Sequence, residues 1–151
     1  MKRFIIAMVA LAVSLAGCAS AGGGGAGISV LQSGAHSAQK DEVFKDFHNQ
    51  ADLDAFLATA FDKGAAPKIS VDWNTQMVIA MFAGAKKNTG IRVGITKVDE
   101  SGDQVQVSSR VVIPCSKDST PEATSPYQIV AAPASTKTVN FNDPDVDYQK
   151  C

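Results

Sequence analysis

Few side chains in this sequence could do chemistry: three cysteines, two histidines and a short run of aspartates. The histidines, His36 and His48, lie in the polar N-terminal part of the chain, far from Cys115 and Cys151. A nucleophilic cysteine needs a nearby base and a third group to orient that base, and a zinc site needs closely spaced ligands. Neither pattern is present, and no Ser, His and Asp grouping indicates hydrolysis. We therefore expect a protein that is not an enzyme and that holds no metal or cofactor.

The aspartates Asp143, Asp145 and Asp147 alternate along the chain as they do in a calcium-binding loop. The stretch lacks the central glycine and the terminal glutamate of an EF-hand. We expect a polar C-terminal tail here that is tied down by Cys151, with a weak surface calcium site as the alternative.

The N-terminal residues predict export from the cytoplasm. Lys2 and Arg3 precede an uninterrupted apolar run over residues 4–13, which is the layout of a secretory signal. The run is shorter than the roughly 20 apolar residues that span a bilayer. We therefore expect it to be removed and not to persist as a membrane helix.

The segment Leu15-Ala16-Gly17-Cys18 resembles the lipobox of bacterial lipoproteins. The resemblance implies that residues 1–17 are a lipoprotein signal peptide and that Cys18 carries acyl chains such as palmitate. Several acyl chains would form a stable membrane anchor, because each buried methylene contributes about 0.8 kcal/mol. Ala19 stands where an aspartate would indicate retention in the inner membrane. We expect a lipoprotein of the bacterial envelope, on the periplasmic face or the surface of the outer membrane. The alternative is an ordinary signal peptide with a chance cysteine.

Residues 18–27 combine the lipidated cysteine with a run of Gly and Ala that is typical of a flexible tether. The run lacks the preceding strand and the following helix of a phosphate-binding loop. Residues 28–151 then form a single globular domain. Without Lys2 and Arg3, 12 basic residues stand against 15 acidic ones, a formal net charge of −3, so nucleic acid is not an expected partner.

Once Cys18 is assigned to lipid, an even pair of cysteines remains. Such a pair in an exported domain predicts a disulfide, here between Cys115 and Cys151. The bond would stabilise the fold by roughly 3–4 kcal/mol on the chain-entropy estimate. The alternative is a buried, free Cys115 and a frayed, reactive Cys151.

The clearest helix covers residues 49–64. Asn49 suits the N-cap position, and Asp52 places a carboxylate at the positive end of the helix dipole. The helix carries one apolar stripe, at helical spacing: Leu53, Phe56, Leu57, Ala60 and Phe61. We expect this stripe to pack on the core, because so short a helix needs tertiary burial to persist. We likewise expect Trp73 at the edge of the core, with an exposed binding residue as the alternative.

Runs rich in Val, Ile and Thr predict strands, separated by turn-forming residues. The predicted strands cover residues 28–32, 68–71, 76–83, 90–98, 104–113, 127–132 and 139–141, and residues 43–47 form either a strand or a turn. The short turns imply antiparallel neighbours, and the best-marked hairpin turns at residues 101–103. We expect an α+β domain, mainly an antiparallel β-sheet or sandwich with one covering helix.

Four short motifs lie along residues 77–141: Phe82-Ala83-Gly84, Thr89-Gly90, Pro114-Cys115 and Pro126-Tyr127. Together they resemble the C-terminal domain family of the protease complex subunit PrcB. Ile91-Arg92 departs from the family, which tends to have Gly-Tyr there, and Asn88 stands where proline is common. The resemblance implies an accessory subunit that binds and stabilises a secreted or surface protease without catalysing a reaction.

The loop after Ala83 is either the bend of a hairpin or a protein-contacting tip. A strand follows Lys86 and Lys87, so no helix N-terminus is available for a phosphate. Asn88 and Gly90 tolerate a left-handed backbone, which suits a tight turn. Under the binding interpretation the partner-contacting residues are Lys87, Asn88, Thr89, Gly90, Ile91 and Arg92, with Tyr127 as a second contact. The alternative for Tyr127 is a buried ring with a hydrogen-bonded hydroxyl.

Two other functions remain open at this stage. The Thr-Gly part of the loop resembles the loops of chagasin-like cysteine protease inhibitors, which implies loop-mediated inhibition. A structural or small-ligand-binding lipoprotein would need no such loop contact.

Overall fold

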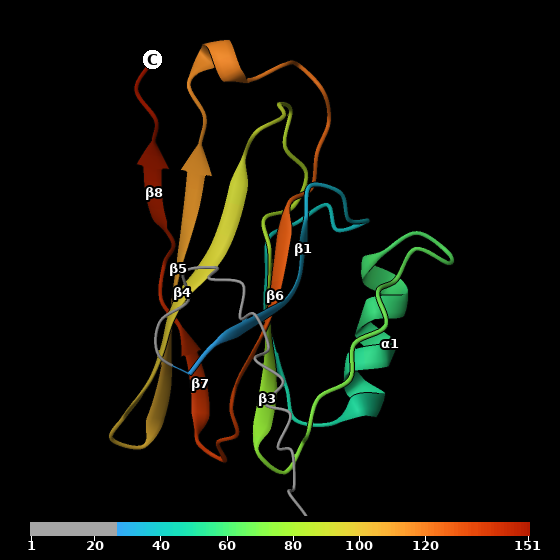
Figure 1. The fold of residues 1–151 in the computed structure, drawn as a ribbon, viewed down its shortest axis with the longest axis vertical. Helices are drawn as coiled ribbons and strands as arrows, with labels where there is room; N and C mark the ends of the chain where they lie inside the picture. The colour runs from blue at the N-terminus through green and yellow to red at the C-terminus, as the bar shows by residue number, and fades with distance from the viewer. Residues whose placement is uncertain (1–26) are drawn as a thin grey trace, which may run out of the picture.

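Figure 1 shows the computed structural model, which describes residues 27–151. Two β-sheets pack face to face, and one helix covers the outer face of the first sheet. The expected α+β class, mainly antiparallel sheet with one covering helix, is confirmed. In chain order the elements are β1 (Ser29–Gly34), β2 (Val43–Phe47), α1 (Gln50–Ala60), β3 (Gln76–Phe82), β4 (Arg92–Ser101), β5 (Gln104–Ile113), the 3-10 turn η1 (Ser116–Asp118), β6 (Tyr127–Pro133), β7 (Thr138–Phe141) and β8 (Asp145–Tyr148).

The signal peptide, the lipobox and Cys18 lie outside the described residues, as does all of the tether except Gly27. Within the described range, 27–151, no helix is both long and apolar enough to cross a membrane.

The two sheets differ in topology. The first has the order β1-β6-β3-β2, and all its neighbours are antiparallel. In the second, β4 and β5 form the expected hairpin, whereas β7 and β8 both run parallel to β5. The prediction of antiparallel neighbours is therefore wrong for β7, and β8 is a strand that was not predicted. The physical reason is that β6 and β7 belong to different sheets, and the short crossover between them starts β7 at the end of the domain where β5 also starts.

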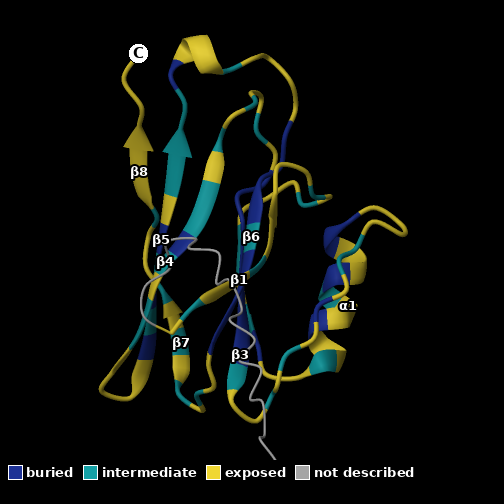
Figure 2. Cartoon of the chain, viewed as in Figure 1, coloured by how far each residue is buried: buried dark blue, intermediate teal, exposed yellow. Residues whose placement is uncertain are grey.

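The strand β3 is buried on both of its faces, which explains its continuous apolar sequence. Its alternate side chains face different layers: Val78, Ala80 and Phe82 face α1, whereas Met77, Ile79 and Met81 face the second sheet. Figure 2 shows this buried layer running through the middle of the molecule. Each fully buried side chain of this size contributes about 1.5–3 kcal/mol, so the first sheet is the structural centre of the domain.

The helix α1 forms as its sequence predicts, although it ends at Ala60, earlier than expected. The Asn49 side chain caps it by accepting a hydrogen bond from the Asp52 backbone N–H at 2.9 Å. Leu53, Leu57 and Ala60 are buried against the first sheet, so the apolar stripe serves the core.

Residues 68–71 form no strand, and that prediction is wrong. This segment runs along α1, where Ile69 is buried and its carbonyl accepts a hydrogen bond from the Gln50 side chain at 2.7 Å. The Ile69 carbonyl is thus hydrogen-bonded to a side chain of α1 and not to a neighbouring strand. The neighbouring Trp73 is half-buried and donates from its indole N–H to the Gln50 side-chain oxygen at 3.2 Å, which supports its place at the core edge.

The β4–β5 hairpin follows the prediction closely. Gly102 has a φ of 61° in the turn, a left-handed conformation that suits glycine. In β5, Val105 and Val107 are each 1% exposed and face the first sheet, while Gln104 is exposed. One face of this strand is therefore in the core and the other is in water.

Candidate functional site

The end of the chain is fixed beside β5 by a disulfide. Cys115 and Cys151 are bonded as expected, with their Cα atoms 5.2 Å apart. The Gln149 N–H also donates to the Ile113 carbonyl at 2.9 Å. The expected polar tail is thus fixed through Cys151, but it is not a simple tail, because residues 145–148 form the strand β8 and pair with β5.

The pairing of β8 with β5 creates an exposed apolar surface. Val146 lies opposite Val111, and Tyr148 lies opposite Ile113, so these four side chains share one face of the sheet. This face continues the core-facing side of β5, but here the second sheet extends past the first, as Figure 1 shows. Val146 is therefore 51% exposed and Tyr148 71% exposed.

The surface is concave, with a volume of about 290 Å³, and we call it the apolar hollow. Its lining combines an apolar floor with one acidic and one basic residue: Glu42, Lys86, Ile91, Val111, Ile113, Pro144, Val146 and Tyr148. Lys86 and Ile91 come from the β3–β4 loop, so this loop forms one wall. The other wall is β8, which the disulfide holds in place.

The β3–β4 loop is not a hairpin bend, because β3 and β4 belong to different sheets. It crosses from the first sheet to the second and adopts a left-handed backbone at Gly84 (φ 70°) and Gly90 (φ 81°). The expectation for Gly90 is confirmed, whereas Asn88 has no positive φ. Gly84 is also sterically required, since a Cβ there would lie 2.7 Å from the Lys40 carbonyl oxygen.

Hydrogen bonds fix the loop against residues 119–124. Lys86 and Thr124 exchange a pair of backbone hydrogen bonds of 2.7 and 3.0 Å. The Thr89 N–H donates to the Thr120 carbonyl at 3.0 Å, and the two threonine hydroxyls are 2.9 Å apart. The loop is therefore ordered before any partner arrives.

The expected loop contacts fall into two groups. Lys87, Asn88 and Arg92 are exposed and available to a partner. Thr89 and Gly90 instead shape the loop, one through its hydrogen bonds and the other through its backbone conformation.

Ile91 is half-buried and lies between two concavities. One is the apolar hollow. The other, also of about 290 Å³, is lined by Ser33, Gly34, Ala35, Ile91, Arg92, Val93, Tyr127 and Gln128. The structure thus brings the loop residues Ile91 and Arg92 to the same place as Tyr127.

Tyr127 is only 6% exposed, so the structure supports its buried interpretation and corrects the expectation of a surface contact. Its ring stacks on Phe82, with the ring centroids 5.4 Å apart, and meets Phe61 edge-on at 4.9 Å. Such aromatic pairs stabilise a core beyond the area that they bury. Only the rim of this side chain reaches the concavity beside the loop.

Four residues of the apolar hollow were not predicted as site residues: Val111, Ile113, Val146 and Tyr148. A signal for the last two exists in the sequence: in residues 145–148, carboxylates alternate with large apolar side chains, the period of a strand with two different faces. Three closely spaced aspartates drew attention to the carboxylates and away from that alternation.

The aspartates do not converge. Asp145 and Asp147 pair with Arg110 and Val112 of β5 and so lie on the outer face of the second sheet, opposite to the hollow. Across residues 27–151, no three His, Cys, Asp or Glu side chains are grouped so as to hold a metal ion.

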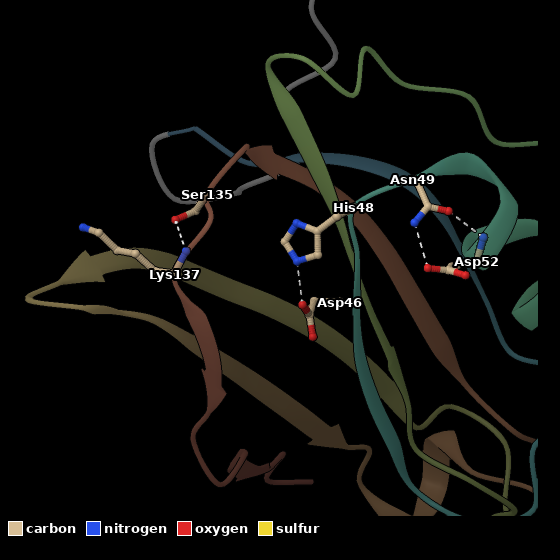
Figure 3. A network of polar contacts seen from close by, with 6 residues as sticks. All are labelled: Asp46, His48, Asn49, Asp52, Ser135 and Lys137. Atoms are coloured by element: carbon tan, nitrogen blue, oxygen red, sulfur yellow. Dashed lines mark hydrogen bonds and ion pairs between the residues drawn. The ribbon is translucent and has the colours of Figure 1, made fainter.

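A further concavity, of about 540 Å³, lies at the opposite end of the domain, and we call it the polar hollow. It is lined by His48, Trp73, Asn74, Gln76, Glu100, Ala134, Ser135, Thr136 and Lys137. Figure 3 shows part of this region, where the His48 ring lies 2.8 Å from an Asp46 carboxylate oxygen and the Lys137 backbone N–H donates to the Ser135 hydroxyl. The hydrogen bond from Lys137 to Glu100, aided by Ser135, lowers the pKa of Glu100.

Comparison with protein-family profiles, with curated protein sequences and with solved structures finds no match to the chain. The resemblance to the PrcB family thus stays a prediction that rests on the four short motifs in residues 77–141.

Proposed function

We propose that this protein is a non-catalytic lipoprotein of the bacterial envelope, which binds another protein through the apolar hollow. The observation that carries the proposal is the exposure of Val146 and Tyr148 on a wall that a disulfide fixes in place. Aromatic side chains on a rigid, apolar patch are enriched among the residues that dominate binding energy at protein interfaces.

The shape of the apolar hollow favours a protein over a small ligand. Its volume of about 290 Å³ lies at the lower limit of small-molecule sites, which usually enclose most of the ligand. The exposed Tyr148 stands at the edge of an open surface, where only a larger partner can cover it.

The rigidity of the β3–β4 loop supports the same function. A loop that is already ordered by its hydrogen bonds to residues 119–124 loses little conformational entropy on binding. Lys87, Asn88 and Arg92 can then add polar contacts around the apolar centre.

The lipobox and the PrcB-like motifs extend the proposal. They support a membrane-anchored accessory subunit that stabilises a secreted or surface protease, with the domain attached through Cys18. A loop-mediated inhibitor is the variant in which the same contact blocks the protease.

Affinity capture from the native envelope tests the proposal. The lipidated protein is crosslinked and recovered as the wild type and as the Val146→Asp, Tyr148→Asp double variant. We expect the variant to lose at least about 90% of the captured partner, because two carboxylates are forced into an apolar interface. Its melting temperature should stay within a few degrees, since both side chains are already exposed.

The matched control is the Ala134→Asp, Thr136→Asp double variant in the polar hollow, which adds the same charge to exposed positions. It should capture the partner as the wild type does. A further variant, Asn88→Ala with Arg92→Ala, measures how much the β3–β4 loop contributes to partner capture. Equal capture by all four proteins would contradict the assignment, and a protease assay on the captured material separates stabilisation from inhibition.

A further inference from the structure

The strand β8 lies at an edge of the second sheet. Among residues 27–151 it pairs with β5 alone, and Figure 1 shows no element on its other side. All four of its residues are exposed. An exposed strand edge carries unpaired backbone N–H and C=O groups, which can bind one more strand.

The two faces of β8 would impose different demands on an added strand. On the inner face, Val146 and Tyr148 border the apolar hollow. On the outer face stand Asp145 and Asp147, both exposed to water. Because side chains alternate between the faces of a strand, an added strand would place every second residue beside the apolar pair and the others beside the aspartates.

The negative charge on the outer face favours an added strand with basic side chains. Asp145 has Arg110 opposite it on β5, but Asp147 has the neutral Val112, and Asp143 adds a third carboxylate nearby in the chain. A basic side chain on the added strand would therefore meet unneutralised negative charge.

The same charges disfavour a second copy of this chain. Two β8 strands paired edge to edge would bring aspartates of one copy next to those of the other, and like charges in neighbouring strands are destabilising. The edge is thus protected against self-association but open to a strand of opposite charge.

We propose that the partner contributes an extended segment of alternating apolar and basic residues, which adds to β8 as a further strand and places its apolar side chains beside Val146 and Tyr148, at the edge of the apolar hollow. This inference rests on the proposed function and specifies the partner of the same site. The backbone would supply affinity, while the alternation would supply specificity.

The test uses the oxidised protein and a fluorescent eight-residue peptide of alternating Lys and Val. We expect saturable binding by fluorescence anisotropy, with slower amide hydrogen exchange in residues 145–148. Two control peptides isolate the causes: one alternates Glu and Val, and one is the Lys–Val peptide with alternate backbone nitrogens methylated. Both should bind at least about tenfold more weakly, because one repels the aspartates and the other lacks strand donors.

Protein variants give the complementary test. Asp145→Asn with Asp147→Asn should weaken binding of the Lys–Val peptide by roughly two- to tenfold at low salt, since exposed ion pairs are individually modest. The control, Asp54→Asn with Asp103→Asn, makes the same change in net charge on α1 and at the β4–β5 turn, away from β8, and should bind as the wild type does.

Absence of Lys–Val binding at millimolar concentration, or equal binding of all three peptides, overturns the inference. Sedimentation of the free protein as a β8-dependent dimer would also overturn it, in favour of a second copy. These outcomes are distinct from failure of the proposed function, which is decided by partner capture with the Val146→Asp, Tyr148→Asp variant.

Discussion

The two hollows at opposite ends of the domain differ in how many of their side chains already have partners within the domain. In the polar hollow, Lys137 binds Glu100 at 2.6 Å, and the Trp73 indole donates to Gln50. In the apolar hollow, Val146 and Tyr148 are largely uncovered within the described part of the chain. The larger concavity is thus internally paired, while the smaller one has apolar surface that no other part of residues 27–151 covers.

The two ends are also held by different means. The apolar end depends on one covalent bond and on glycines that permit close backbone approach, at Gly84 and Gly90. The polar end depends on exposed hydrogen bonds and ion pairs, each of which contributes little in water. Comparable substitutions should therefore change the stability of the protein by different amounts at the two ends.

The largest expected effect comes from the disulfide. Cys151→Ser should lower the free energy of unfolding by roughly 3–4 kcal/mol, because the unfolded chain is no longer closed into a loop. It should also weaken partner capture, since β8 loses its anchor. Urea unfolding monitored by circular dichroism measures the first effect. A reducing agent should destabilise the wild type and leave Cys151→Ser unchanged; equal stability of both oxidised proteins would refute the role of the bond.

The glycines give a matched comparison between the ends. Gly84→Ala should cost about 3 kcal/mol, because it combines left-handed strain with a clash against the Lys40 carbonyl. Gly102→Ala, in the β4–β5 turn, should cost about 1 kcal/mol, because its φ of 61° is strained but no atom lies within 4 Å of the new Cβ. Thermal unfolding of both variants measures the ratio of the two losses of stability. Similar costs would mean that the β3–β4 loop is less tightly packed than the structure indicates.

A smaller, stabilising effect is expected at Ser109 on the inner face of β5. Its side chain is 2% exposed, and its hydroxyl has no hydrogen-bond partner among residues 27–151. Ser109→Ala should raise the free energy of unfolding by about 1 kcal/mol, because an unsatisfied buried hydroxyl is removed. Denaturant unfolding tests this, with Ser108→Ala on the half-buried neighbouring residue as the control. A loss of stability at Ser109→Ala would show that the hydroxyl is satisfied.

The smallest effect is expected at the polar end, at Glu100. The pKa of its carboxyl is lowered by the hydrogen bond from Lys137 and by that from Ser135. The stabilisation is therefore present above the ordinary glutamate pKa of about 4.3 and is lost as the pH falls through the lower, folded-state value. Glu100→Gln should lower the melting temperature slightly at neutral pH, and the difference from the wild type should vanish in acid. A difference that grows as the pH falls would contradict this sign.

Local patterns predicted the elements well. The apolar stripe of α1, its Asn49 cap and the Gly102 turn each depend on neighbouring residues, and all are confirmed. The predictions were wrong where contacts between residues far apart in the sequence determine the local structure. Residues 68–71 have strand-like composition, but a hydrogen bond from Gln50 draws their backbone to the helix.

The site was harder to predict than the fold. The number of cysteines predicted the disulfide. The strand in residues 145–148 could not be predicted in the same way, because it depends on where β5 ends in space. Val111 and Ile113 resemble ordinary core residues in sequence, but they are only half-buried, because the second sheet extends past the first at this end. For Tyr127 the sequence left a surface contact and a buried ring open, and the packing of Phe61 and Phe82 around it decides for the buried ring.

Site-specific photocrosslinking in the native envelope tests the central claim most directly. A photoreactive phenylalanine derivative replaces Tyr148 in the apolar hollow or, in a separate protein, Thr136 in the polar hollow. The account predicts one discrete crosslinked protein from position 148 and none from position 136. A crosslinked protein from position 136 alone, or none from either, would contradict the assignment of the apolar hollow as the binding site.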